Sequence, residues 1–199
     1  MASVLLTGAC SSDEGDDDTG AATSRVERTT TTTRPEEPGN DKPWEVEPLV
    51  AVLLQRYDEV VNQIVADPTV VRDSNDPLVV EFRSLFDPDS DFAQESLDSW
   101  AEMADNGVSL KPQSSKYPVN VTYIDGNVIP GEDDEVSFAQ CAVQRWVRFQ
   151  DGKETDRSVD GALLAGNGSA VRVDGHWLLE ELTTPEGMEG CSNGSEAPT

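Results

Sequence analysis

The hydrophobic period of this chain changes at Gly107, and that change most constrains its fold. Before Gly107, apolar residues recur at three- and four-residue steps, which is the spacing of a helix with one buried face. Three helices are predicted in this half. The first carries Pro48 in its first turn, the second starts at Asp76-Pro77, and the third runs from about Ser90 to Gly107.

After Gly107 the pattern alternates with a period of two, which is typical of half-buried strands. Asp-Gly pairs between alternating runs are the strongest short-range hairpin signal in a sequence. One long strand is predicted from Val136 to Phe149, and the predicted turns are Asp125-Gly126, Asp151-Gly152 and Asp174-Gly175. The second half is therefore expected to be an antiparallel meander.

Helices followed by strands predict an α+β domain, with N-terminal helices packed on one face of a curved antiparallel sheet. Over residues 44–184, and in its closing hairpin at 173–178, the chain resembles the NTF2-like superfamily, which includes SnoaL-like and ketosteroid-isomerase-like proteins. The resemblance implies a cone with a pocket between the helices and the concave face. The chain departs from that family because its sequence predicts three helices before any long strand.

The long strand predicts which side chains would face such a pocket. Residues with odd numbers from Ala139 to Phe149 form its more apolar face, so we expect that face beneath the helices. Arg145 lies on it and would need an acidic partner or a place in a cavity wall. Large aromatic side chains at such spacings either line a ligand pocket or pack in the core. The candidate pocket residues are Tyr57, Trp100, Tyr123, Arg145 and Trp146.

The N-terminus contains a second informative motif at Cys10. The run Leu6-Thr7-Gly8-Ala9-Cys10 resembles the lipobox of bacterial lipoproteins, which implies lipidation of Cys10 and anchoring at the extracytoplasmic face of the cell membrane. Residues 1–9 lack the basic residues of a complete signal peptide, so we expect that the true start lies upstream. The alternative is an ordinary cytosolic N-terminus that happens to contain a cysteine.

Residues 10–43 are acidic and rich in threonine and proline, and they predict a disordered tether. A globular domain is expected over 44–191, followed by a disordered tail at 192–199. If Cys10 is lipidated, Cys141 and Cys191 remain as a pair for a disulfide in an oxidising compartment. Their spacing is also compatible with two separate buried thiols that form no disulfide.

The net charge of −25 argues against some partners. Residues 48–199 alone hold 28 acidic and 10 basic residues, so the domain would repel nucleic acid and anionic headgroups. Membrane association is therefore expected through the lipid on Cys10 rather than through a basic patch. The same negative field could steer a cationic ligand, and adaptation to a salty habitat is the alternative reason for this composition.

Motifs for catalysis and metal binding are largely absent from the sequence. There is one histidine, His176, beside a predicted turn, and no nucleophile elbow or phosphate-binding glycine loop. The acidic run 87–91 begins like an EF-hand but has Phe92 where that loop needs glycine, so we interpret it as a helix start. No catalytic residue, metal or cofactor is predicted.

The sequence therefore favours a lipid-anchored, non-catalytic binding or interaction domain, whose object is a small apolar ligand or an envelope protein. The alternative is an extracytoplasmic enzyme of the SnoaL or ketosteroid-isomerase kind that acts on a hydrophobic ring. A carboxylate or histidine with a raised pKa, directed into a closed apolar pocket, would distinguish the enzyme.

Overall fold

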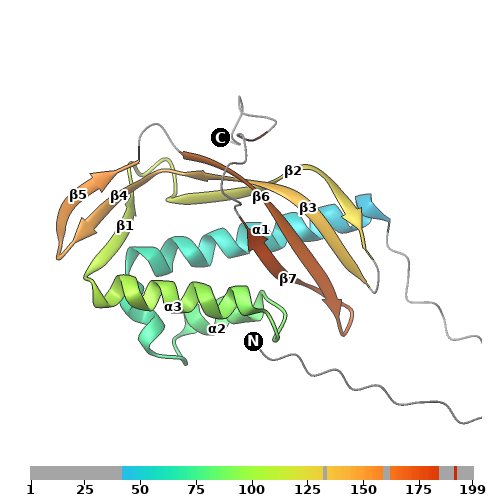
Figure 1. The fold of residues 1–199 in the computed structure, drawn as a ribbon, viewed down its shortest axis with the longest axis horizontal. Helices are drawn as coiled ribbons and strands as arrows, with labels where there is room; N and C mark the ends of the chain where they lie inside the picture. Colours follow the sequence, from blue (N-terminus) through green and yellow to red (C-terminus); the bar gives the residue numbers. More distant parts are fainter. Residues whose placement is uncertain (1–41, 132–133, 159–161, 184–190, 192–199) are drawn as a thin grey trace, which may run out of the picture. The chain divides into compact units, whose positions relative to one another are not determined.

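The computed structural model describes residues 42–131, 134–158, 162–183 and 191, all in the second of the chain's two units, 36–199. The α+β prediction is confirmed: helices lie on one side of antiparallel strands (Figure 1). Cys10, the proposed signal segment, most of the proposed tether and the 192–199 tail lie outside the described residues. The helices are α1 (Pro43–Ala66), the 3₁₀ helix η1 (Pro68–Arg72), α2 (Pro77–Ser84) and α3 (Asp91–Asp105).

The predicted starts of the second and third helices are confirmed by their caps. The Asp76 carboxylate accepts a hydrogen bond from the Leu78 N–H at 2.9 Å, and the Ser90 hydroxyl accepts one from the Ala93 N–H at 3.4 Å. Gly107 follows α3 with φ of +63°, a conformation that favours glycine. The predicted start of the first helix is wrong, because Pro43 takes the first turn and Pro48 lies inside the helix.

The strands form two sheets. The order in the larger sheet is β2-β3-β6-β7, and in the smaller one it is β1-β4-β5. The strands are β1 (Val108–Pro112), β2 (Asn120–Pro130), β3 (Glu135–Gln144), β4 (Trp146–Gln150), β5 (Lys153–Arg157), β6 (Ala162–Val173) and β7 (His176–Thr183).

The predicted single strand from Val136 to Phe149 is wrong, since it breaks at Arg145 into β3 and β4, which belong to different sheets. At the break, the Arg145 N–H donates to the Val119 carbonyl at 2.8 Å. That bond satisfies the backbone where the chain passes from one sheet to the other.

One of the three predicted Asp-Gly turns is also wrong. Asp125-Gly126 lies inside β2, where the register moves from Ile124 opposite Gln140 to Val128 opposite Phe138. The strand bulges there, and Gly126 supports the bulge with φ of +120°. The other two turns are confirmed, because both of their Asp-Gly pairs join antiparallel strands and have positive φ.

The face of β3 that packs beneath the helices is the one that holds Val136 and Phe138, so the predicted face is wrong. The Phe138 ring packs so closely on Gly168 of β6 that a Cβ added there would lie 2.4 Å from it. The sequence pattern predicted the wrong face because the polar side chain of Gln140 is buried on this same face. Its Nε2 donates to the carbonyls of Asn167 and Thr183, each at 3.4 Å.

Cys141 lies on the opposite face of β3, where it forms a disulfide with Cys191. The two Cα atoms are 5.6 Å apart, and both residues are buried. Cys191 therefore lies against the face of β3 that the sequence pattern had assigned to the helices.

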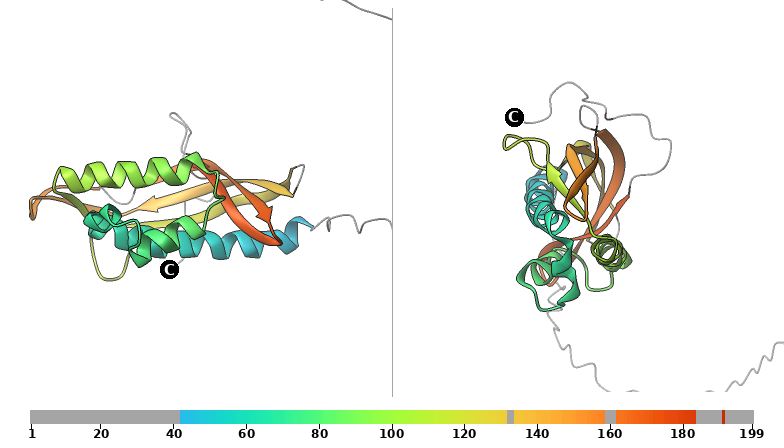
Figure 2. Two further views of the ribbon diagram at one scale, coloured as in Figure 1. Left: turned by 90° about the horizontal axis from the view of Figure 1, so that it is seen from below. Right: turned by 90° about the vertical axis from the view of Figure 1, so that its left-hand side faces the viewer.

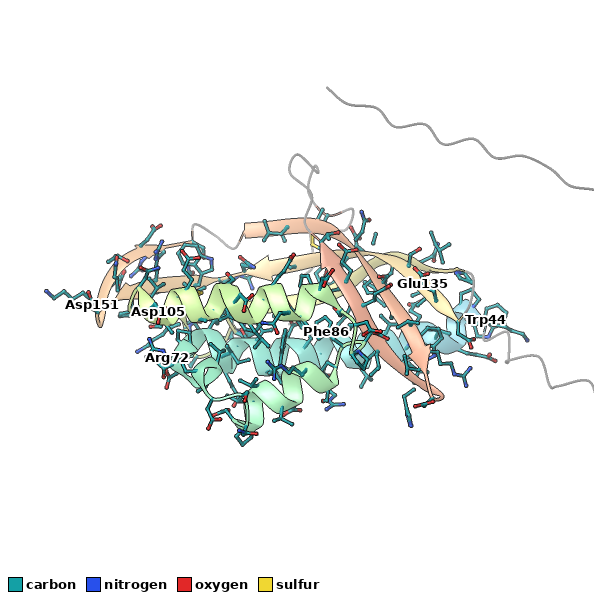
Figure 3. The ribbon with its side chains drawn as sticks, turned by 60° about the horizontal axis from the view of Figure 1, so that its bottom comes forward. Trp44, Arg72, Phe86, Asp105, Glu135 and Asp151 are labelled. Carbon is teal, nitrogen blue, oxygen red and sulfur yellow. A yellow bond between two sulfur atoms is a disulfide. The ribbon has the colours of Figure 1, made fainter. Side chains whose placement is uncertain are left out.

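Helices α1 and α3 lie along two different sides of the sheets. Seen from below (Figure 2, left), α1 and α3 run along opposite sides, with strands visible between them. In Figure 3, Trp44 and Glu135 lie toward one end of the domain, and Arg72, Asp105 and Asp151 lie toward the other. In the part of the chain that the structure describes, no helix has the length and apolar character needed to cross a bilayer.

Reducing the disulfide is expected to lower the free energy of unfolding by about 4 kcal/mol, because the bond closes a loop over a sequence separation of 50. Urea unfolding with and without dithiothreitol measures this difference. Cys191→Ser should unfold like the reduced wild type and should not respond to the reductant. Identical midpoints for oxidised and reduced wild type would contradict the assignment.

Candidate functional site: an aromatic cleft beside an acidic groove

A cleft of about 500 Å³ lies between α1, α3 and the strands at one end of the sheets. Apolar and aromatic side chains dominate its walls, and the polar groups among them are few. The lining residues are Tyr57, Val61 and Val65 from α1; Phe92, Glu95, Ser96, Ser99, Trp100 and Met103 from α3; Leu110, Asn120, Gln144 and Trp146 from the strands; and Val119, which directly precedes β2.

Three of the five predicted pocket residues line this cleft, namely Tyr57, Trp100 and Trp146. Trp100 is also part of the core, since it is only 8% exposed and its ring meets the Phe82 ring edge-on with centroids 4.8 Å apart. Tyr57 meets the ring of Phe86 edge-on at 6.0 Å. The cleft wall is thus continuous with a packed aromatic layer that holds it rigid.

The other two predicted residues, Tyr123 and Arg145, lie outside the lining of the cleft. Tyr123 is opposite Cys141 in the register of β2 and β3, on the disulfide face of the sheet. The guanidinium carbon of Arg145 lies 4.5 Å from the centroid of the Tyr117 ring. Arg145 therefore stacks on an aromatic face, instead of the acidic partner or cavity position expected from the sequence.

Asp58 is the residue that the sequence argument missed. It is buried on α1, and its Oδ1 accepts hydrogen bonds from Asn120 Nδ2 at 2.7 Å and from the Thr122 hydroxyl at 2.9 Å. Its Oδ2 accepts from the Thr122 backbone N–H at 2.5 Å. One helical turn later, Asn62 donates to the Asn120 carbonyl at 2.9 Å and accepts from the Asn120 N–H at 2.8 Å.

Burial raises the pKa of Asp58 to about 6, against hydrogen bonds from Thr122 and Asn120 that favour the charged form, and with a smaller contribution from Glu59. Burial also raises the pKa of the neighbouring Tyr57, and the Asp58 charge adds to that rise. Asp58 itself is absent from the cleft lining, whereas its partner Asn120 is present. A sequence signal did exist: an Asp and an Asn four residues apart on the flank of an apolar helix.

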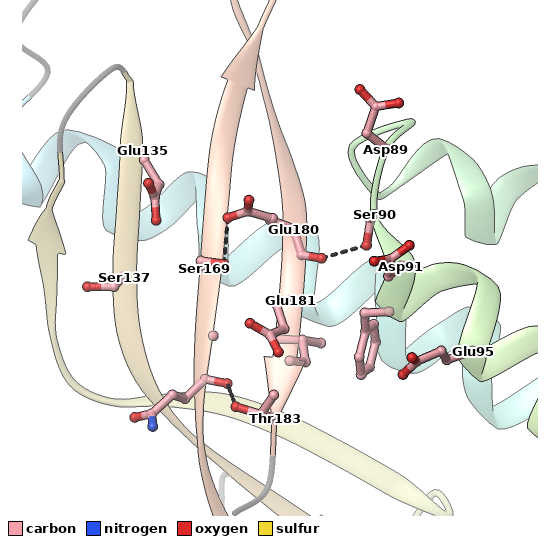
Figure 4. A pocket seen from close by; sticks show the side chains of 14 residues that line it. Asp89, Ser90, Asp91, Glu95, Glu135, Ser137, Ser169, Glu180, Glu181 and Thr183 are labelled. Atoms are coloured by element: carbon pink, nitrogen blue, oxygen red, sulfur yellow. Dashed lines mark hydrogen bonds between the residues drawn. The ribbon is translucent and has the colours of Figure 1, made fainter. Parts of the chain in front are cut away.

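A second hollow, of about 1150 Å³, lies between the start of α3 and the strands β3, β6 and β7 (Figure 4). We call it the acidic groove, because six carboxylates line it: Asp89, Asp91, Glu95, Glu135, Glu180 and Glu181. The Ser90 hydroxyl donates to the Glu180 carbonyl at 2.6 Å, and the Ser169 hydroxyl donates to the Glu180 carboxylate at 2.8 Å. Phe92 and Glu95 line both hollows, so the groove and the cleft meet at these two residues.

The described residues contain no group of three or more His, Cys, Asp or Glu side chains placed to hold a metal ion. In the acidic run 87–91, Ser90 caps α3 and Asp91 lies in its first turn, as the helix-start interpretation expects. His176 is exposed at the start of β7.

Comparison with known proteins informs the fold alone. No protein-family model matches the chain, and neither does any curated protein. Among solved structures, the chain is similar to the crystal structure of the intermembrane space region of the chloroplast protein ARC6, with a TM-score of 0.50. The two are 8% identical over 73% of this chain and 97% of that one.

The Asp58 carboxyl is expected to titrate with a midpoint near pH 6, which carbon-detected NMR of the side chain would measure. Its pKa is higher in the folded chain than the ordinary 3.8, so between these values the folded state holds a proton that the unfolded chain has lost. The free energy of unfolding should therefore fall by about 1–3 kcal/mol as pH rises from about 4 to 6.

The variant Asp58→Asn lacks this titrating group but keeps the other carboxylates. The difference between the pH profiles of wild type and variant therefore reports on Asp58 alone. Parallel profiles, together with an Asp58 midpoint near 4, would contradict the assignment.

Proposed function

We propose that this chain is a lipid-anchored extracytoplasmic protein with a non-catalytic, NTF2-like binding domain, and that the domain takes a small apolar ligand. The observation that carries the proposal is the aromatic cleft between α1 and α3. Its volume of about 500 Å³ is within the range of small-molecule sites. Tyr57, Trp100 and Trp146 contribute aromatic side chains to its lining, against which an apolar ligand can pack.

The polar groups of the cleft suit recognition better than catalysis. Gln144 and two serines supply donors and acceptors, whereas the Asn120 amide already donates to Asp58 and Thr122. Glu95 is the only charged residue among the described residues of the lining. A binding site of this kind fixes the orientation of a ligand through a few polar contacts and gains its affinity from apolar burial.

An enzyme of the SnoaL or ketosteroid-isomerase kind is the second candidate, and Asp58 is the observation that favours it. The pKa of Asp58 is raised, and Tyr57, its neighbour in sequence, lines the cleft. However, both oxygens of Asp58 already accept hydrogen bonds from Thr122 or Asn120. Asp58 is also absent from the cleft lining, and a general base must lie within hydrogen-bond reach of the substrate, so the binding function is the better supported of the two.

Anchoring through Cys10 is proposed from the lipobox-like run alone. The cell membrane is then the proposed location, and the lipid on Cys10 is the proposed membrane contact. An envelope protein remains an alternative object of the domain, in place of the small ligand.

Binding in the cleft is tested with the neutral fluorophore N-phenyl-1-naphthylamine and a pair of matched tryptophan variants. Trp146→Leu should weaken binding about tenfold, because it removes a stacking wall. Trp44→Leu is the control, since Trp44 is 66% exposed on α1 and outside the cleft lining. Equal affinities for the two variants, or no binding by wild type, would refute the cleft as the site. Native mass spectrometry of the protein purified from its host would show any retained natural ligand.

Anchoring is tested by metabolic labelling of the protein with an alkyne fatty acid in its native host. Wild type should be labelled and should fractionate with membranes, whereas Cys10→Ala should not be labelled. Equal labelling of the two proteins would refute the anchor without affecting the test of the cleft.

A further inference from the structure

The aromatic cleft and the acidic groove share a border that constrains the charge of the ligand. Phe92 and Glu95 on α3 line both hollows. A molecule seated between Tyr57, Trp100 and Trp146 therefore has Glu95 at the side where the cleft passes into the groove. Among the described residues, no other charged side chain lines the cleft, so Glu95 sets the charge preference within it.

The groove beyond Glu95 strengthens the same preference. Its six carboxylates come from α3 and its start, from β3 and from β7, and the part of the lining that the structure describes holds no Lys or Arg. The ion pairs seen among the described residues, Arg56–Glu81, Arg72–Asp105 and Arg157–Glu154, involve none of these six. Carboxylates gathered in a concave surface focus a negative potential that attracts cations and repels anions.

The walls of the cleft also favour a cation. The faces of tyrosine, tryptophan and phenylalanine rings attract ammonium and guanidinium groups as well as apolar rings. Tyr57, Phe92, Trp100 and Trp146 present four such side chains next to Glu95. Aromatic stacking and a carboxylate at one border are together complementary to a molecule with a ring at one end and a positive charge at the other.

We infer that the ligand is a small organic cation with one or two rings, whose ring occupies the cleft and whose ammonium or guanidinium group lies at Glu95, facing the acidic groove. This inference rests on the proposed function and adds the charge of the ligand to it. The volume of the cleft, about 500 Å³, is within the range of sites that bind molecules of this size.

Three probes with the same ring and different charges test the inference by isothermal titration calorimetry: 1-naphthylmethylamine, 1-naphthylmethanol and 1-naphthaleneacetate. The amine should bind about tenfold more tightly than the alcohol, because several exposed carboxylates each contribute a small attraction. The acetate should bind more weakly than the alcohol. The preference for the amine should shrink as NaCl is raised from 50 to 500 mM, because the Debye length falls from about 14 to about 4 Å.

Glu95→Gln should weaken amine binding about two- to fivefold and leave binding of the alcohol unchanged, since it removes one exposed charge at the border. The matched control is Glu47→Gln, which makes the same charge change at an exposed position of α1, outside both hollows. Both substitutions are at exposed positions, so thermal unfolding should show that both variants fold.

The outcomes separate this inference from the function on which it rests. Equal binding of the amine and the alcohol, or equal effects of the two Glu→Gln substitutions, would overturn the cation and leave the cleft as a binding site. Failure of all three probes to bind would overturn both. Binding of an arginine-rich peptide that 1-naphthylmethylamine does not displace would overturn the small-molecule ligand in favour of a protein partner.

Discussion

The fold depends on two side chains of α1 that complete the hydrogen bonding of an edge strand. β2 lies at one edge of the larger sheet, where backbone groups would otherwise lack a neighbouring strand. Asn62 bonds both the N–H and the carbonyl of Asn120, and Asp58 accepts from the N–H of Thr122. The helix therefore takes the place of a fifth strand, and this fixed position puts Tyr57 in the cleft wall.

The cleft between α1 and α3 follows from how each of these two helices is held against the strands. α1 is fixed to β2 by the polar contacts of Asp58 and Asn62, while α3 is held by aromatic packing between Trp100 and Phe82. The side chains that remain between the two helices are mostly apolar, and they end at Glu95, where the acidic groove begins. A high acidic charge alone says little about a ligand, but an aromatic cavity that borders a concave acidic surface favours an aromatic cation.

Local signals were sufficient for much of the fold. The caps at Asp76 and Ser90, the end of α3 at Gly107 and two Asp-Gly turns each depend on a few adjacent residues, so the sequence predicts them. The break at Arg145 and the bulge at 125–126 depend on which distant strand pairs with which, and no local pattern determines that pairing. The face of β3 was misjudged because Gln140 finds buried partners on β6 and β7, and because Cys191 bonds to Cys141 on the opposite face. For the site, aromatic spacing pointed to Tyr57, Trp100 and Trp146, which line the cleft, whereas the role of Asp58 required knowledge that β2 is an edge strand.

The central claim, that the cleft between α1 and α3 binds a ring-bearing ligand, is tested most directly by the four tryptophan indole N–H signals in a ¹⁵N-correlation NMR spectrum. Trp100 and Trp146 line the cleft, whereas Trp44 and Trp177 do not. Titration with 1-naphthylmethylamine should shift the signals of Trp100 and Trp146 with one common saturation curve and leave those of Trp44 and Trp177 in place. Shifts confined to Trp44 or Trp177, or no saturable shift of any signal, would contradict the account.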